Sequence, residues 1–446
     1  MKQKYVPLYV RILRLGIGAI LFLSPFYAPL AVWAARRLRH LDFFKIWKEI
    51  ALTLLATVLV SFLLTHRAFA KRLFKNRLLL VMTAYLLLVT SIGLYDLLTH
   101  RVSNDAVIYG LLVDLRLIGI FVVALITLKM SARFRLPTFQ WRRLTLWPAL
   151  FVVTFGLLQM TVLPADILSH IGYSQSTIVP YQTVDNQPGF VRVQSTLRGA
   201  NPLGAYLVVV ITLLAAMLFE KSRRSKLYLG LFLVGSVVVL FGTYSRSAEL
   251  GLVLSFICLL AIYKEKFVNR HTAGVLVVSI VVIVVGAIAI TSNSYTAQNI
   301  IFHSSDRSNS RVSSNAERLS ALKGGLEDVY HSPWGSGVGS AGPASRRNSY
   351  ASERIAENYF LQVGQEVGVL GMLIFTAINV MVAYQLWLRR SNVLAKALLA
   401  SLVGVTFINL VSHAWTDDTL SLIWWGLAGL AVAPHYPAAK RSLSHR

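Results

Sequence analysis

The chain is dominated by apolar stretches long enough to cross a lipid bilayer, and this pattern fixes its fold class. Twelve such stretches lie at about residues 8–33, 47–65, 78–98, 105–130, 144–163, 201–219, 227–243, 249–264, 273–291, 359–388, 396–412 and 419–434. A spanning helix needs ~20 residues. Hydrophobic residues make up 55% of the 446 positions and charged residues 14%, a balance that polar surface could not cover in water. We therefore expect an all-α polytopic membrane protein of about twelve helices, with one transmembrane domain over residues 1–446.

The net charge of +25 is carried mainly by short loops on one side of this topology. Those loops are 67–77, 129–143, 221–226, 264–270, 389–396 and 440–446. By the positive-inside rule they are cytoplasmic, which also places both termini inside. The long loops on the opposite side, 164–200 and 292–358, are close to neutral. The basicity therefore indicates orientation, and we expect no nucleic-acid partner.

One basic segment, 34–48, breaks the pattern, because counting spans places it outside. It contains Arg36, Arg37, Arg39 and Lys45. Either the first apolar stretch, interrupted by Pro25 and Pro29, is a hairpin that returns to the cytoplasm, or the basic patch meets anionic lipid on the outer face. We favour the outer position.

The longest polar segment is an insert of 67 residues, 292–358, with seven Arg or Lys and six Asp or Glu. A membrane protein that keeps one large segment outside the bilayer usually does its work there. We expect this insert to form the lid and part of the floor of an active site, next to the second external loop, 164–200.

A helix is predicted within the insert, near residues 316–330. Ser314 and Glu317 match a capping box, and apolar residues follow at spacings of three and four. These are Leu319, Leu322, Leu326 and Val329. The apolar stripe is expected to lie on the outer leaflet or on the tops of the spans.

Three glycines, Gly335, Gly337 and Gly339, follow the predicted helix. A glycine-rich turn can aim backbone N–H groups at phosphate. Without a preceding strand and a following helix, however, this spacing is weak evidence of nucleotide binding. We favour the interpretation that the segment is a plain loop that needs no ligand.

Arginines stand at the water-facing ends of two spans. Arg192 and Arg198, six residues apart, are suited to gripping a diphosphate, because guanidinium pairs bidentately with phosphate oxygens and stays charged. Snorkelling to the interface is an equally good interpretation. Arg246 lies at a helical hairpin tip beside Tyr244 and Ser245, on the side where a topology anchor is less common. We favour a functional role there.

Charged residues also occur inside the spans. Asp114 and Arg116 fall mid-stretch, where an isolated charge costs ~2.5–3.5 kcal/mol. Being two residues apart they point to different helix faces, so we expect each to pair with another helix; a place in the substrate cavity is the alternative. Glu366, one turn from Gln362, could carry protons in a transporter. The ten His residues are scattered without metal-ligand spacing, so no metal and no cofactor are expected.

Three segments together resemble the O-antigen ligase and O-antigen polymerase superfamily of bacterial membrane glycosyltransferases. They are 192–204 (RVQSTLRGANPLG), 243–248 (TYSRSA) and 317–371, the last with a Pro-x-Gly-x-Gly turn and a Glu-x-Gly-x-x-Gly motif. The resemblance implies a multi-pass protein of the bacterial cytoplasmic membrane whose active site faces outward. It also implies an undecaprenyl-diphosphate-linked oligosaccharide donor, a glycan or glycolipid acceptor, and contact with membrane lipid.

The resemblance also assigns roles to residues. It implies that Arg192 and Arg246 contact the donor pyrophosphate, with help from Arg318. Glu357 stands where ligases of the family have a histidine, directly before Asn358, and is our candidate for the general base or the acceptor-orienting group. The predicted catalytic residues are Glu357, Arg192 and Arg246. The predicted substrate-binding residues are Arg198, Asn201, Tyr244, Ser245, Arg318, Asn358 and Glu366.

The carboxylate at position 357 favours a polymerase over a ligase, because polymerases of the superfamily vary more at this position. We therefore expect metal-independent, inverting transfer of a glycan from undecaprenyl diphosphate to an acceptor sugar hydroxyl at the outer face of the membrane. The first alternative is a ligase that transfers glycan to lipid A core or another acceptor. The second is a flippase or transporter of lipid-linked oligosaccharides, which would use Asp114, Arg116 and Glu366.

Overall fold

The computed structural model describes residues 7–38, 41–134, 136–137, 139–184, 187–220, 226–264 and 314–433. The apolar stretch predicted at 273–291 and the first part of the insert, 292–313, lie outside the described residues. The long helices are α1 (Leu8–Leu23), α2 (Tyr27–Leu38), α4 (Trp47–Thr65), α6 (Arg77–Thr99), α7 (Asn104–Arg133), α8 (Trp141–Thr161), α9 (Ala200–Glu220), α10 (Lys226–Gly242), α11 (Arg246–Ile262), α14 (Ser314–His331), α15 (Tyr359–Leu388), α16 (Val393–Leu410) and α17 (Asp418–Val432). Short helices are α3 (Leu41–Lys45), α5 (Arg67–Leu73), η1 (Ser24–Phe26), η2 (Ile167–Ile171), η5 (Gly342–Arg347) and η6 (Ala414–Thr416).

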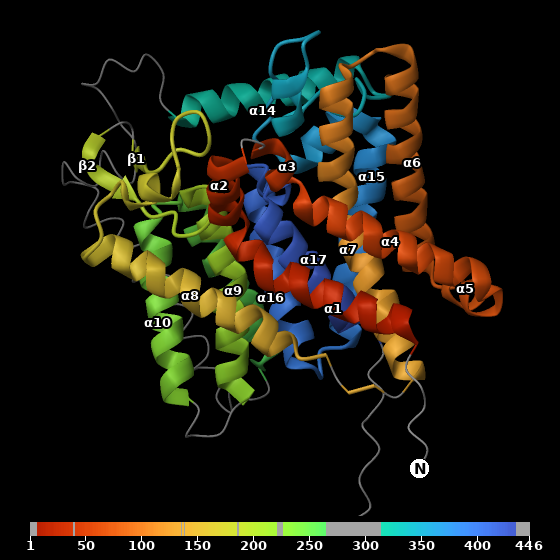
Figure 1. Ribbon diagram of the computed structural model, residues 1–446, viewed down its shortest axis with the longest axis horizontal. Helices are drawn as coiled ribbons and strands as arrows, with labels where there is room; N and C mark the ends of the chain where they lie inside the picture. Colours follow the sequence, from red (N-terminus) through yellow and green to blue (C-terminus); the bar gives the residue numbers. More distant parts are fainter. Residues whose placement is uncertain are drawn as a thin grey trace, which may run out of the picture.

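The architecture is that of an all-α polytopic membrane protein (Figure 1). Within the described residues, eight helices are long and apolar enough to cross a membrane, counting Leu8–Leu38 as one, and α10 and α17 are shorter apolar helices. The total of twelve spans stays a prediction.

A short antiparallel hairpin was missed by the sequence reasoning. Strand β1 (Gln182–Val184) pairs with β2 (Gln187–Arg192), with Gln182 opposite Arg192. The strands are short, and Pro188 and Gly189 within β2 weaken the strand signal of its neighbours. The hairpin matters because it ends on Arg192.

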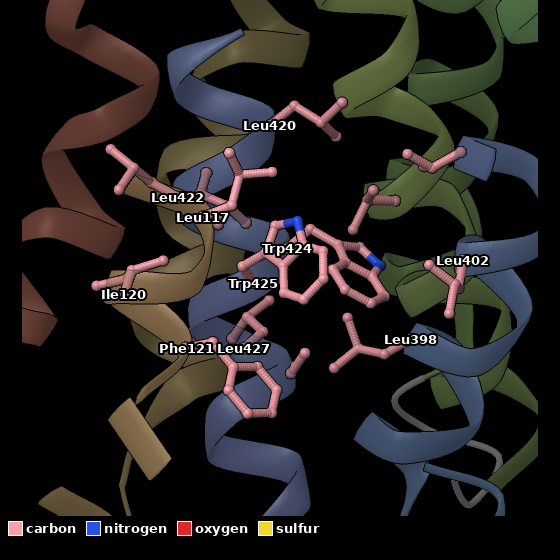
Figure 2. Packing of buried hydrophobic residues seen from close by; sticks show 14 of the residues in the cluster. Leu117, Ile120, Phe121, Leu398, Leu402, Leu420, Leu422, Trp424, Trp425 and Leu427 are labelled. Carbon is pink, nitrogen blue, oxygen red and sulfur yellow. The ribbon is translucent and has the colours of Figure 1, made fainter. Parts of the chain in front are cut away.

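Helix α17 forms the centre of the bundle, although it is short. Its 15 residues reach ~22 Å, less than the ~30 Å hydrocarbon thickness, and every residue from Thr419 to Val432 is buried. A short helix is tolerated here because protein surrounds it. Figure 2 shows Trp424 and Trp425 packed between side chains of α7, such as Phe121, and of α16, such as Leu398. The mid-depth of the bundle is therefore an aromatic and aliphatic core.

One end of the bundle, which we call the insert face, is formed by α14, η5, the β1–β2 hairpin and the turn 411–417. Figure 1 shows α14 lying nearly perpendicular to α6, α7 and α15 at their upper ends. The connection between α6 and α7 belongs to the same face, because Ser103 Oγ donates to Arg347 O at 2.8 Å. The second polar loop belongs to it too, since it contains the β1–β2 hairpin and its Arg198 lies 3.1 Å from Asp417 Oδ2. Thr196 Oγ1 of the same loop donates to Pro25 O at 2.7 Å.

The opposite face brings together helix ends that adjoin the basic loops. Lys396 Nζ lies 2.7 Å from Glu220 Oε1, and the Tyr263 hydroxyl donates to the same carboxylate at 3.0 Å. The ends of α9 and α11 and the start of α16 thus share one face, as the charge pattern predicts. Which membrane side each face occupies stays a prediction.

The segment after α1 lies on the insert face. Helix α1 ends at Leu23, and after the turn η1, which contains Pro25, α2 packs Tyr27 and Val32 against Leu168 and Tyr173 of the second polar loop. The Arg36 guanidinium donates to His170 O at 3.0 Å. The segment therefore lies at the insert face, and its outer position in the membrane stays a prediction.

Helix α14 occupies the region where an amphipathic helix is predicted. Val329 is 8% exposed and packs with Ala356 and Leu361, whereas Leu319 and Leu326 are 53% and 54% exposed. Only half of the predicted apolar stripe therefore packs on the bundle.

Candidate active site

The two predicted arginine segments are in direct contact at the insert face. Arg192 Nε donates to Thr243 O at 2.8 Å, and a terminal nitrogen of the same guanidinium donates to Asn201 Oδ1. Val193 N donates to Gly242 O at 2.9 Å, so the backbone also joins the end of β2 to the end of α10. Arg192 therefore connects the turn before α11 with the first turn of α9.

Arg246 is the first residue of α11, and its turn packs tightly on α9. A Cβ placed at Gly204 would lie 2.9 Å from Ala248 Cβ and 3.0 Å from Ser245 Cβ, so only glycine allows this approach. Tyr244 is held in the left-handed region, with φ of +50°. Two helix N-termini, each with partial positive charge, thus lie together, one beginning with Arg246 and the other bonded to the Arg192 guanidinium, an arrangement suited to an anion.

The end of α16 supports both this turn and the start of α15. A Cβ at Gly251, five residues into α11, would lie 2.9 Å from Gly404 O, so α11 and α16 are in backbone contact. Asn358, which caps α15 by accepting from Leu361 N at 3.0 Å, donates its amide to Leu410 O at 3.1 Å. Helix α16 thus brings the Arg246 turn and the Glu357 segment to one region of the insert face.

Glu357 directly precedes Asn358, the N-cap of α15, and faces an imidazole. Its backbone φ is +49°, a left-handed conformation that costs roughly 1–3 kcal/mol for a residue other than glycine. Its Oε2 lies 3.8 Å from Nδ1 of His413, in the turn after α16. Strained residues of this kind cluster at functional sites, and Tyr244 is a second example within the predicted set.

Three arginines surround the Glu357–His413 pair. Arg318 of α14 and Arg346 of η5 act on both groups, and Arg198 acts on His413. Burial raises the pKa of the Glu357 carboxyl, and the two arginines partly offset this rise. Burial and the three positive charges lower the pKa of His413 to about 4, so the imidazole is neutral near pH 7.

The side chain of Arg198 is held by the carboxylate of Asp417. Its Nε lies 3.1 Å from Asp417 Oδ2, and its side chain keeps 30% exposure. Asp417 also caps α17 by accepting from Leu420 N at 2.9 Å. Burial raises the pKa of the Asp417 carboxyl, and Arg198 opposes this shift. One carboxylate thus fixes both the start of the central helix and the position of Arg198.

A buried ionic cluster continues beneath Arg198. Arg116 NH1 contacts Glu49 Oε1 at 2.8 Å and also the Asp418 carboxylate, and Lys48 Nζ lies 3.2 Å from both carboxylates. Together with Arg198 and Asp417, three positive and three negative side chains balance. Arg116 is thus paired with other helices, as expected from its place in α7.

The glycine turn is occupied by contacts within the protein. Val338 N donates to Asp96 Oδ2 at 2.8 Å and Gly339 N donates to Glu366 Oε1 at 3.0 Å, while Gly337 N donates to Glu366 O at 3.1 Å. All three glycines have positive φ, and a Cβ at Gly339 would lie 2.2 Å from Ala106 O. The turn therefore has a packing role that needs no phosphate, in agreement with the loop interpretation.

Glu366 is buried beneath this turn. It is 1% exposed, and its carboxyl lies next to that of Asp114, which is 3% exposed. Asp114 thus pairs with α15, again as expected. The contacts of Glu366 are those of a group that anchors the glycine turn.

The structure thus brings the predicted residues together in two groups, with exceptions. Arg192, Asn201, Tyr244, Ser245 and Arg246 form the first group, and Arg198, Arg318 and Glu357 form the second. Glu366 lies deeper. Asn358 is 8% exposed, and both ends of its amide bond to backbone, as described above. Ser245 is 3% exposed.

Sequence reasoning did not assign His413, Asp417 or Arg346 to the site. His413 and Asp417 lie in a short turn between two apolar spans, a place where polar residues are expected anyway. The signal that could have found them is topological, because this turn lies on the same predicted side as Glu357.

Within the described ranges, no group of three or more His, Cys, Asp and Glu side chains is placed to hold a metal ion. Fold and site define a multi-pass membrane protein with arginine, carboxylate and imidazole side chains gathered at one face. Residues 231–376 match a family model described as O-antigen ligase, which confirms the resemblance to the O-antigen ligase superfamily, a family of glycosyltransferase-like enzymes. The match includes Arg246, the glycine turn and Glu357, and it ends before His413. No match was found among curated proteins.

Proposed function

We propose that the protein is a polysaccharide polymerase of the O-antigen type. It transfers a glycan from undecaprenyl diphosphate to an acceptor sugar hydroxyl, without a metal ion and with inversion at the anomeric carbon. The reaction takes place at the insert face, which is the outer side of the cytoplasmic membrane in this proposal.

The observation that carries the proposal is the contact between the two arginine segments. Arg192 donates to Thr243 O, and Thr243 is three residues before Arg246. Arg198 lies in the same loop as Arg192, six residues later. Guanidinium groups that lie beside two helix N-termini suit a diphosphate, which carries adjacent negative charges. The predicted residues come from separate parts of the chain, so their meeting supports a common ligand.

The arginines would act on the leaving group. When the bond between the anomeric carbon and the phosphate oxygen breaks, negative charge grows on the lipid diphosphate. Donors placed in advance lower the barrier by stabilising this charge, and removing one typically costs ~3–4 kcal/mol. Arg192 and Arg246 are proposed for this role.

Glu357 is proposed to take the proton of the acceptor hydroxyl. Burial raises the pKa of its carboxyl, which makes the ionised form a better base than an exposed glutamate. The strained backbone at this position indicates that the side chain is held where the fold requires it.

A ligase is the second candidate, and the description of the matched family favours it. The two activities differ in what is lost with the gene. Loss of a polymerase leaves single repeat units on the cell surface, whereas loss of a ligase leaves long glycans attached to the lipid carrier.

The proposal is tested with purified protein, a synthetic prenyl-diphosphate oligosaccharide and a chelator of divalent ions, with products read by mass spectrometry. We expect lengthened glycan together with released prenyl diphosphate. Movement of the oligosaccharide across liposomes without any new glycosidic bond would instead support a transporter.

A further inference from the structure

His413 is the feature of the insert face that the proposed function leaves unused. It belongs to the turn between α16 and α17, outside the matched segment. Its imidazole faces Glu357, the carboxylate that stands where the superfamily's ligases are expected to have a histidine. An imidazole is thus present beside this position, supplied by another part of the chain.

The carboxylate and the imidazole lie next to each other, but no hydrogen bond joins them. Nδ1 of His413 lies 3.8 Å from Glu357 Oε2, beyond the 3.2 Å limit typical of such hydrogen bonds. Nδ1 is buried and has no hydrogen-bond partner among the described residues. A buried nitrogen without a partner costs free energy, so its retention needs an explanation.

The charges around the pair come from three other elements. Arg318 projects from α14, Arg346 from η5, and Arg198 from the loop before α9. Asp417 lies in the same turn as His413 and is bonded to Arg198. Arg346 is paired with Glu353, at 2.7 Å, so two of the three arginines have a carboxylate partner of their own.

We propose that His413 and Glu357 form an acid–base pair that takes the proton of the acceptor hydroxyl. This inference rests on the proposed glycosyl transfer and names the residue that completes its base. Glu357 is the group that contacts the hydroxyl, and His413 shares the proton through Nδ1.

The acceptor oxygen forms a bond to the anomeric carbon, and the bond from that carbon to the diphosphate oxygen breaks, with its electron pair leaving on the lipid diphosphate. The hydroxyl proton moves to a Glu357 carboxylate oxygen and is then shared with His413 Nδ1. When substrates bind, the 3.8 Å separation between Glu357 and His413 closes to hydrogen-bond distance, because catalytic hydrogen bonds that are long in the free enzyme tighten in the complex.

The donor itself strengthens the base in this arrangement. Without donor, burial and the three arginines hold the pKa of His413 at about 4. A donor anion that reaches Arg198 and Arg318, both predicted to bind substrate, offsets part of their effect on this pKa, so the imidazole accepts a proton more readily. Proton transfer is thereby coupled to the presence of donor.

The test is a double-mutant cycle with the purified, full-length protein and a synthetic prenyl-diphosphate oligosaccharide. The variants are His413→Gln, Glu357→His and the combination of both. We expect His413→Gln to lower kcat about a hundredfold or more with little change in KM. In the Glu357→His background, where position 357 carries its own imidazole, the same change is expected to cost less than about tenfold.

Two further measurements separate chemistry from folding. His413→Asn places a neutral amide near the position of Nδ1 and Gln places one near Nε2, so whichever variant keeps the wild-type melting temperature serves the test. The acidic limb of the pH profile of kcat/KM should shift in that variant. His331→Gln, at an exposed position at the end of α14, is the matched control and should leave rate and profile unchanged.

The outcomes are distinguishable. If the wild type forms no glycosidic bond, the proposed function fails and the pair fails with it. If the wild type is active and a folded His413 variant stays within about threefold of it, with an unshifted acidic limb, the pair alone is overturned. Equal losses in both position-357 backgrounds would overturn it as well.

Discussion

Two polar assemblies on the insert face are built from similar residues and differ in what their carboxyl groups contact. In the glycine turn, backbone N–H groups point at Asp96 and Glu366, and both carboxyl groups are buried in contact with them. Around Glu357 and His413, by contrast, two groups that could share a proton stand 3.8 Å apart, with arginines on several sides.

The difference shows how a sequence motif acquires its role. The glycine turn looks like a phosphate loop, but its N–H groups are used to fix α15 against α6 and α7. The Glu357 region looks like a motif with its histidine replaced, and its carboxylate faces the imidazole of His413. Motif letters alone do not separate these cases, whereas the backbone N–H groups that donate to Asp96 and Glu366 do.

The largest effect is expected from Gly339→Ala. A Cβ there would lie 2.2 Å from Ala106 O, and the backbone has φ of +83°. Overlap and strain each cost roughly 1–3 kcal/mol, so we expect little folded protein. The yield of folded protein and its melting temperature in detergent measure this loss of stability. Gly324→Ala, on α14 with open space around it, is the control and should keep or slightly raise the melting temperature. A stable Gly339→Ala protein would break the assignment of a packing role.

Arg246→Ala is expected to act on chemistry and spare the fold. Loss of one donor to the leaving diphosphate should lower kcat about a hundred- to a thousandfold, with an unchanged melting temperature. Arg390→Ala, exposed on the opposite face, provides the comparison and should keep full rate. Transfer by Arg246→Ala at the wild-type rate would remove this residue from the mechanism.

The stability of the folded protein should depend on pH through the titration of His413. Its pKa is about 4 in the fold, below the ordinary 6.5, so the folded state binds the proton less tightly than the unfolded chain. Its contribution is therefore present above pH 6.5 and is lost as the pH falls towards 4, by at most ~3 kcal/mol before solvent screening. Melting temperature measured across this range should fall more steeply for the wild type than for His413→Gln. Parallel curves would contradict the buried, neutral imidazole.

The smallest effect is expected from Asp96→Asn. The amide keeps an oxygen that can accept from Val338 N, so the glycine turn should stay in place with a loss of about 1–2 kcal/mol. Activity should stay within threefold if this assembly only supports the fold. A hundredfold loss of kcat with a normal melting temperature would instead place Asp96 in the reaction.

Much of the architecture could be predicted, because a long apolar stretch in the sequence indicates a membrane-spanning helix. The pairing of Asp114 and Arg116 with other helices also followed from their two-residue separation. The β1–β2 hairpin could not be predicted, since its strands are short and interrupted by Pro188 and Gly189. The full burial of α17 was likewise hidden, because an apolar helix reads the same whether lipid or protein surrounds it.

The arginines and Glu357 of the candidate site stand in recognisable segments, so they could be proposed from the sequence, and their roles stay predictions. His413 could not be found in this way, because its relation to Glu357 arises only when α15 and α16 meet at Asn358 and Leu410. The local sequence around either residue does not predict its contact with the other. The contact is a property of tertiary packing.

The central claim is a division of labour, in which arginines hold the lipid diphosphate and the Glu357–His413 pair moves the proton. Binding of a short prenyl diphosphate, measured in parallel with single-turnover transfer, tests it most directly. We predict that Arg246→Ala weakens binding at least about tenfold, whereas Glu357→Gln and His413→Gln bind within about threefold of the wild type and lose transfer. Normal binding by Arg246→Ala, together with weakened binding by the two proton-pair variants, would contradict the account.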